Sequence, residues 1–457
     1  SNDFSLAHND VTDVSYPTLA ASLLPATSGQ QITATEAAWR TIGTLDTLGR
    51  SLRLLGSGDV RTPSTSTLTL GGSSFLAAPV GSTMDIFGQL RVSEGASADV
   101  SADSFLLGSR GILTARTNSS LTINALSADL DGQTRLEQGA SLTFSSSATA
   151  IGPTTVGLNA SLTTGGVFTN IDTFTITAGT ISAPLFYNRA AANIFGSTAI
   201  FGSFANEAGA ITTIPSGSLF VFGSLTNNGT IVGTICTACG STAPNLYVGG
   251  SLILGPAANL TMPFAGSLVH VGGSFDCAID SNTRYHMSVA TLQLEGTGME
   301  QTLEVMSADI GADVLGLDRS IAGQYPIGTL EIGPSPSTIR LVDTHDNDRL
   351  GQSTCEAIYV NELRIGAGSR LINTTCRIYY YYNTLTNNGT VDVPENLIPF
   401  GQPCGGDYNQ DGGIDGADVQ AFFVDWEAGS AAADVNQDGG VDGADVSTFF
   451  EAWEAGC

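Results

Sequence analysis

The sequence predicts a mainly β protein in which a parallel β-solenoid (β-helix) body precedes a small α-helical module. Three observations predict this fold. Short β-prone runs separated by Gly, Asn and Ser fill residues 61–393, phrases within those runs recur at intervals of about 21 to 27 residues, and residues 404–457 hold two acidic loops, each followed by a helical pattern. An interval of this length is typical of one solenoid coil.

The recurring phrases locate the coils. The phrase FGS at residue 201 returns 21 positions later at residue 222, and VGGS at residue 248 returns at residue 271. One coil cannot bury its inward Leu, Ile, Val and Phe, but stacked coils share a core and pair every strand above and below. Gly and Asn suit the corners because they accept the positive φ of tight turns.

The two ends of the body have a different texture. Residues 1–60 are expected to form an N-terminal arm and a cap over the open strand edges, and Thr33–Leu55 is the plausible helix of this part. Phe4 and Leu6 alternate with polar residues, so this arm could add a strand to a neighbouring molecule, although we favour a strand of the cap or a frayed tail. Residues 394–403, which contain three Pro, predict a stiff linker.

The composition excludes several function classes. The 457 residues carry a formal charge of -27, which disfavours binding to nucleic acid or to an anionic membrane surface. All 16 basic residues are Arg, so no lysine nucleophile or P-loop lysine exists. No apolar stretch reaches the roughly 18 residues that a membrane-spanning helix requires.

The cysteines and sequons favour an extracellular or cell-surface location. Cys355 and Cys376 lie 21 residues apart, one coil, which predicts a disulfide between adjacent coils, with chance spacing as the alternative. Cys404 and Cys457 bracket the C-terminal module as a disulfide clasp would, and the start at Ser1 suits a mature exported chain. Six sequons can accept glycans: Asn118, Asn159, Asn228, Asn259, Asn373 and Asn388.

Cys236, Cys239 and Cys277 allow three interpretations. A redox CxxC would need a strand–helix context that the sequence lacks, and a zinc site would have to recruit His270. We favour one disulfide among the three cysteines and one free thiol.

Residues 404–457 contain twelve of the 43 acidic residues and no Arg. Oxygen-bearing residues occupy positions 1, 3, 5, 9 and 12 of two loops, with Gly at position 6 and a backbone carbonyl available at position 7, which is the spacing of a calcium loop. We therefore expect two Ca²⁺ ions, with a structural role. The first site comprises Asp407, Asn409, Asp411, Gly413, Asp415 and Asp418, and the second Asp434, Asn436, Asp438, Gly440, Asp442 and Asp445.

An amphipathic stripe follows each loop, and the two stripes are 27 residues apart: Val419, Phe422, Phe423 and Trp426, then Val446, Phe449, Phe450 and Trp453. We expect these aromatic residues to form the mutual core of two helices. No helix enters either loop, so each unit is a loop followed by a helix, unlike a full EF-hand.

The duplicated phrases DYNQDGGIDGAD and DVNQDGGVDGAD, with Cys404 and the final Gly456-Cys457, resemble a dockerin domain of the GC-ended type on secreted bacterial repeat-rich proteins. The resemblance covers about 54 residues and implies Ca²⁺-dependent docking onto a cohesin-type partner. In cellulosomal relatives, positions 10 and 11 select the partner; here they are Gly416-Ala417 and Gly443-Ala444, which are small and uncharged. The duplication predicts a pseudo-twofold docking face.

The body offers little catalytic chemistry. Its one dense charged cluster, Asp343, His345, Asp346, Asp348 and Arg349, is interpreted as a solvated loop, with a catalytic or second metal site as the alternative. We assign no catalytic residue. We expect a secreted structural or adhesive rod whose C-terminal module docks onto a partner or onto another copy, in a fibre or a surface matrix. The alternative is a dockerin-tethered β-helix protein that binds or degrades polysaccharide, as a lyase or a hydrolase.

Overall fold

A computed structural model gives the fold of the chain. It describes the strands at 18–19, 31–36, 39–41, 44–46, 51–56 and 60–62, then residue 64 and residues 67–455. Within residues 67–455 the gaps are 79–80, 237–241, 297, 313–319, 350–354, 402–404, 410–413 and 437. The side chains are described from residue 62 onward. Phe4 and Leu6 of the predicted arm, and Cys404 and Cys457 of the predicted clasp, lie outside the described residues.

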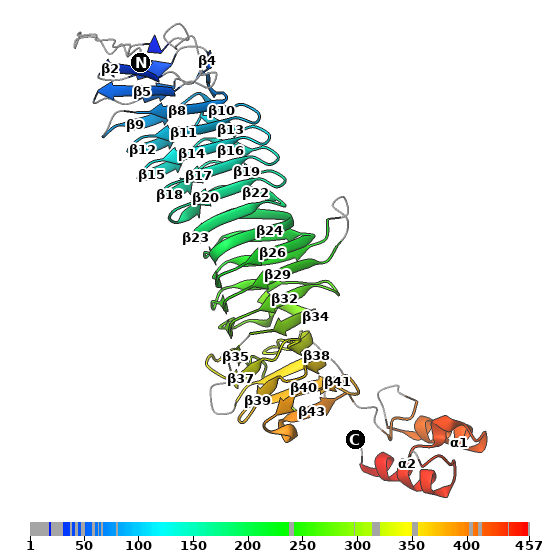
Figure 1. Cartoon of the computed structure of the whole chain (residues 1–457). Helices are drawn as coiled ribbons and strands as arrows, with labels where there is room; N and C mark the ends of the chain where they lie inside the picture. The colour runs from blue at the N-terminus through cyan, green and yellow to red at the C-terminus, as the bar shows by residue number, and fades with distance from the viewer. Residues whose placement is uncertain are drawn as a thin grey trace.

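The body is the predicted parallel β-solenoid. Strands run from β1 (Thr18–Leu19) to β43 (Leu397–Phe400), and each pairs in parallel with strands one coil away, so all of them belong to one pairing network. Figure 1 shows the coils stacked along one axis from the blue N-terminal strands to the orange last coil. Along this axis, β26 (Gly217–Val221) lies between β24 (Ala191–Asn206) and β29 (Pro244–Val248).

The strand register confirms that the repeated phrases occupy equivalent places in successive coils. Val248 at the end of β29 pairs with Val271 at the end of β32 (Leu268–Val271). Phe201 and Phe222, from the two FGS phrases, stack on the outer surface with ring centroids 4.6 Å apart. The sequence period is therefore the coil of the fold.

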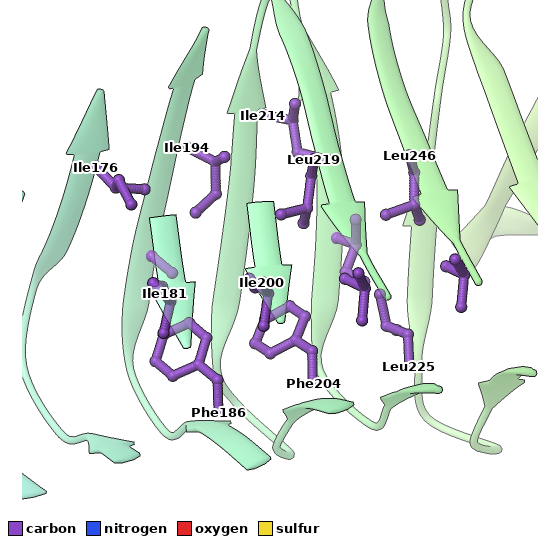
Figure 2. Packing of buried hydrophobic residues seen from close by; sticks show 14 of the residues in the cluster. Ile176, Ile181, Phe186, Ile194, Ile200, Phe204, Ile214, Leu219, Leu225 and Leu246 are labelled. Carbon is purple, nitrogen blue, oxygen red and sulfur yellow. The ribbon is translucent and has the colours of Figure 1, made fainter. Parts of the chain in front are cut away.

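A continuous apolar core runs along the inside of the stack. Side chains alternate between the buried and outward faces of each strand, as strand geometry requires, and the inward ones form one cluster from Leu68 to Ile378. Figure 2 shows how equivalent positions align: Phe186, Phe204 and Leu225 form one row, and Ile176, Ile194 and Ile214 form another. The rings of Phe186 and Phe204 stack with centroids 5.2 Å apart.

A ladder of buried amides accompanies this row of rings. Asn170, Asn188, Asn206 and Asn227 are each fully buried, and they follow by two residues the buried Phe168, Phe186, Phe204 and Leu225. The Nδ2 of each of the first three donates to the Oδ1 of the next at 2.8 Å, one bond per coil. These bonds satisfy polar groups that burial would otherwise leave unpaired at a substantial cost in free energy. The ladder therefore fixes the register of four successive coils.

One corner of the solenoid confirms the expected role of Gly and Asn. Gly95, Asn118, Gly139 and Asn159 stand one coil apart, and each has a φ between 54° and 67°. The N–H of each donates to the carbonyl of a residue in the next coil, so the corner is itself hydrogen-bonded along the axis. Gly and Asn tolerate this left-handed conformation better than other residues do.

The helix predicted over Thr33–Leu55 is wrong. This segment contains β2 (Gln31–Glu36), β3 (Trp39–Thr41), β4 (Thr44–Asp46) and β5 (Ser51–Gly56). These strands pair in parallel with later ones, β2 with β5 and β5 with β8 (Ser73–Ala77), as in the body. The spaced leucines suit a helix locally, but pairing with the neighbouring coils overrides that preference.

The segment predicted as a linker also belongs largely to the solenoid. Residues Pro394–Asn396 form a short 3-10 helix, and β43 follows directly. This strand pairs with β40 (Arg377–Tyr381) and includes Pro399. Proline is compatible with a strand at the edge of a sheet, because its missing N–H faces no partner there. The solenoid therefore extends to Phe400.

The cysteines of the body follow the predicted scheme in part. Cys355 and Cys376 form a disulfide with Cα atoms 5.4 Å apart, which confirms the predicted bond between adjacent coils. Cys236 is disulfide-bonded, and Cys277 is a buried free thiol. No helix among the described residues is long and apolar enough to cross a membrane.

Candidate functional site

The C-terminal module consists of two loop–helix units. Helix α1 spans Gly416–Glu427 and helix α2 spans Gly443–Ala455, and both lie beyond the last coils in Figure 1. Asp415 caps α1: its side chain accepts from the N–H of Ala417 at 2.7 Å. Asp442 holds the N–H of Ala444 in the same way at 2.8 Å. Each acidic loop therefore leads directly into a helix.

The second loop is organised by its own carboxylates. Asp434, at position 1, accepts from the N–H groups of Asp438 and Gly439 at 3.1 and 3.0 Å. Asp438, at position 5, accepts from the N–H of Gly440 at 3.0 Å. Gly439 has a φ of +89°, which explains the need for glycine at position 6. Asn436, at position 3, accepts from the N–H of Asp438 at 2.9 Å. The oxygens of positions 1, 3 and 5 therefore share one turn.

The aspartate at position 12 ties the two ends of each loop together. Asp445 is fully buried and accepts from the N–H of Asn436 at 3.2 Å and from that of Asp442 at 2.8 Å. Asp418 does the same with Asn409 and Asp415, at 3.1 and 2.8 Å. In both cases the backbone N–H donors, that of position 9 foremost, hold the pKa of the carboxyl below its usual value. Each loop therefore holds an ionised carboxylate at its base.

The two units are related by reciprocal contacts. The rings of Phe422 and Phe449 stack face to face with centroids 4.3 Å apart and planes 5° apart. The Nε1 of Trp426 donates to the carbonyl of Asp442 at 2.9 Å, and that of Trp453 donates to the carbonyl of Asp415 at 3.3 Å. Each helix thus braces the opposite loop, as expected of a pseudo-twofold pair.

The apolar stripes of the two helices form their mutual core, as predicted. Phe422, Ala433 and Phe449 are its buried centre, and the remaining predicted members, Val419, Phe423, Trp426, Val446, Phe450 and Trp453, pack around it partly buried. The small size of this core limits the free energy that apolar burial can contribute to the module.

The residues at loop positions 10 and 11 are exposed in both units. Gly416, Ala417, Gly443 and Ala444 lie on the surface at the start of the two helices. A Cβ added at Gly416 or at Gly443 would meet no atom within 4 Å. Another protein could therefore approach the backbone closely at two symmetry-related places.

The donors of the module suit a hard divalent cation. Every side chain at loop positions 1, 3, 5, 9 and 12 offers an amide or carboxylate oxygen, and residues 404–457 contain no Arg, Lys or His to neutralise them. Oxygen donors in this number are those that Ca²⁺ prefers. Asp407, Asn409, Asp415 and Asp418 of the first loop are described, whereas Asp411 and Gly413 lie outside the described residues.

The charged cluster of the body is more ordered than a solvated loop. It lies between β37 (Thr338–Val342) and β38 (Ala357–Ile365), and its Asn347 is buried. The Nε2 of His345 lies 2.8 Å from Asp276 Oδ1, and Glu304 accepts from the N–H of His345 at 2.7 Å. No local sequence motif indicates this contact, because Asp276 is 69 residues away from His345 in the sequence.

Two further acids of this region carry shifted pKa values. Burial, with Asp348 and Asp343 nearby, raises the pKa of Glu356 to about 8. Burial also raises the pKa of Glu304 above its usual value. Glu356 could not be predicted as a member of this group, because it follows the charged cluster by several residues and stands alone there.

The predicted glycan acceptors differ in accessibility. Asn118, Asn159 and Asn388 are exposed, and Asn228 and Asn259 are half-buried. Asn373 is fully buried, with Nδ2 donating to the carbonyl of Val393 at 2.8 Å and Oδ1 accepting from its N–H at 3.0 Å. Burial leaves no room for a glycan on Asn373, so the folded protein offers no acceptor at this sequon.

Comparison with known proteins adds no relative. No protein-family model, curated protein or solved structure matches this chain.

Proposed function

We propose that this chain is a secreted structural protein, in which a rigid solenoid rod is joined to other molecules through a calcium-dependent, dockerin-like module. The partner is a cohesin-like protein or the next copy of the chain, and the product is an extracellular fibre or surface matrix. The observation that carries the proposal is the paired arrangement of the module, in which two acidic loops expose equivalent Gly-Ala steps.

The loops supply the reason for calcium dependence. Carboxylates that converge without a cation repel one another, and residues 404–457 have no basic group to relieve that repulsion. Binding of Ca²⁺ would fix both loops and, through the two Trp–carbonyl bonds, the relative placement of the helices. The docking face would therefore exist only when calcium is bound.

The body supports a mechanical role. Its strands pair along the axis over many coils, and its core is continuous, so the body resists bending as one unit. The outward positions of the coils carry few charged residues, and the exposed Phe201 and Phe222 are stacked on each other. Such a surface suits a spacer or an adhesive rod.

Electron microscopy and light scattering of the purified full chain would test the proposal, first in calcium and then in excess chelator. We expect fibres that dissociate on chelation if the partner is another copy. If the chain stays monomeric in calcium, the partner is a separate receptor. An immobilised cohesin domain should then capture the chain in calcium and release it in chelator.

The matched control is Asp434→Ala together with Asp407→Ala, which removes the first ligand of each loop. This variant should behave in calcium as the unmodified chain does in chelator. Calcium-independent assembly, or cleavage of polysaccharide by the purified chain, would contradict the proposal; cleavage would favour the dockerin-tethered enzyme.

A further inference from the structure

A second group of acidic side chains gathers in the body, far along the sequence from the C-terminal loops. Asp346 and Asp348 lie on the connection between β37 and β38, and Glu356 immediately precedes β38. One carboxylate oxygen from each lies within 4.8 Å of the others. Asp343, at the start of the same connection, accepts from the N–H of Glu356 at 3.2 Å through Oδ2.

Two carboxylate oxygens of this group are buried without a hydrogen-bond partner. Glu356 is only 4% exposed; its Oε1 accepts from the N–H of Asp348 at 2.9 Å, whereas its Oε2 has no partner. Asp343 Oδ1 is likewise buried and without a partner. A buried carboxylate oxygen left in this state costs considerable free energy unless a cation or a proton satisfies it.

The nearby arginines do not supply that cation. Arg349, on the same connection, forms its ion pair with Asp280, and Arg284 pairs with Asp280 as well. Among the described residues, no ion pair involves Asp343 or Glu356. The positive charges of this region are therefore directed to another carboxylate.

Side-chain hydrogen bonds and a disulfide hold the connection that carries this group in place. Between Asp346 and Asp348, the Nδ2 of Asn347 donates to the carbonyls of Cys277 and Ile279 at 2.9 and 2.7 Å. The hydroxyl of Tyr325 donates to the carbonyl of Asn347 at 2.7 Å. Next to Glu356, the Cys355–Cys376 disulfide fixes the start of β38 to the following coil. The carboxylates thus meet on a rigid support.

We propose that Asp346, Asp348 and Glu356, supported by Asp343, form a further calcium site within the solenoid body. The four side chains offer only oxygen, which suits a hard divalent cation. Oxygens on opposite sides of one Ca²⁺ are separated by roughly 4.6 to 5.2 Å, twice the usual Ca–O distance. A single Ca²⁺ can therefore contact all three carboxylates, with water and backbone carbonyls completing its coordination.

The number of calcium ions bound per chain would test this site. The full chain would be dialysed against Ca²⁺ with excess Mg²⁺, and bound metal would be measured by elemental analysis. The Asp407→Ala, Asp434→Ala variant, in which the C-terminal loops are impaired, should retain one Ca²⁺. Adding Glu356→Gln, which keeps the side-chain shape, should remove that ion.

Two further variants keep the test independent of folding and of the C-terminal module. Asp346→Asn changes an exposed ligand and should also lose one Ca²⁺. Glu362→Gln, on β38 but paired with Arg364 and outside the group, is the matched control and should lose none. Circular dichroism would verify that each variant is folded.

A loop-impaired chain that binds no Ca²⁺, or a Glu356→Gln chain that keeps every ion, would overturn the proposal. In that case a proton on Glu356 satisfies the buried carboxylate. Neither result would bear on calcium binding by the C-terminal loops. Their ions are counted separately, as the difference between the unmodified chain and the loop-impaired chain.

Discussion

The solenoid body and the C-terminal module obtain their stability in opposite ways. In the body, one apolar cluster extends from Leu68 to Ile378, and strands, rings and amides each repeat a favourable contact from coil to coil. In the module, the buried centre is Phe422, Ala433 and Phe449, while twelve acidic residues share 54 positions without a basic residue. We therefore expect the body to be stable by itself, and the module to depend on the Ca²⁺ ions that we propose for its loops.

Because of this difference, we expect the folding of the body and that of the module to respond differently to solution conditions. A repeat array distributes its stability over many equivalent contacts, so conditions that alter one coil leave the others intact. A small two-helix unit has no such reserve, so under the proposed function its folding would follow the concentration of free calcium.

Withdrawal of calcium should give the largest effect. If each loop binds Ca²⁺ at a concentration a thousand times its Kd, each site contributes about 4 kcal/mol to the stability of the module. Differential scanning calorimetry should show a low transition that disappears in chelator and a high transition, from the body, that remains. A single transition that shifts as a whole would show that the two parts unfold together.

Removal of one central ring should distinguish the two cores. Truncation of a buried Phe costs about 3 to 5 kcal/mol. Phe422→Ala should therefore abolish the transition of the module even in calcium, because so few other residues are buried there. Phe204→Ala should lower the midpoint of the body but leave it folded, because neighbouring coils retain their contacts; chemical denaturation followed by circular dichroism measures both.

Breaking the amide ladder should have a smaller effect. Asn206→Leu leaves the Nδ2 of Asn188 and the Oδ1 of Asn227 with one hydrogen bond fewer each, at a cost of about 1 to 3 kcal/mol. The matched control is Asn193→Leu at an outward position of the same strand, which should change stability by less than about 0.5 kcal/mol. Equal effects of the two substitutions would contradict a stabilising role for the ladder.

Labelling of Cys277 should report on the body alone. This thiol is buried, and burial raises its pKa, so the reactive thiolate is scarce in the folded protein. Iodoacetamide should modify Cys277 only when the body unfolds, and the Asp407→Ala, Asp434→Ala substitutions in the module should not change the rate. Mass spectrometry of peptides with residue 277 gives this rate; faster labelling in this variant would mean that the module stabilises the body.

The sequence predicted the parts of the body in which the coil length stays regular. The phrases at residues 201 and 222, and those at residues 248 and 271, return after one coil, and the Cys355–Cys376 spacing links adjacent coils. The helix predicted over Thr33–Leu55 was wrong, because the spaced leucines of this segment fit one face of a helix as well as alternate positions of a strand.

The contacts that depend on irregular coils could not be predicted. Thr291 pairs with Thr329, 38 residues later, so the register beyond this point cannot be extrapolated from earlier coils. This long coil is part of the 69-residue separation between His345 and its partner Asp276. The connection after β37 also folds back on itself, so that Glu356 accepts from the N–H of Asp348. The amide ladder, by contrast, left a signal: Asn follows Phe by two residues at 168, 186 and 204.

Because the strands pair in parallel along the axis, the number of coils also sets the length of the body. Adjacent strands are about 4.8 Å apart, so each complete coil extends the rod by that increment, whatever the length of its outer turns. Duplication or loss of a coil would change the reach of the C-terminal module in steps of this size without altering either end. In an assembly of such chains, the spacing between junctions would be set by the number of coils in the gene product.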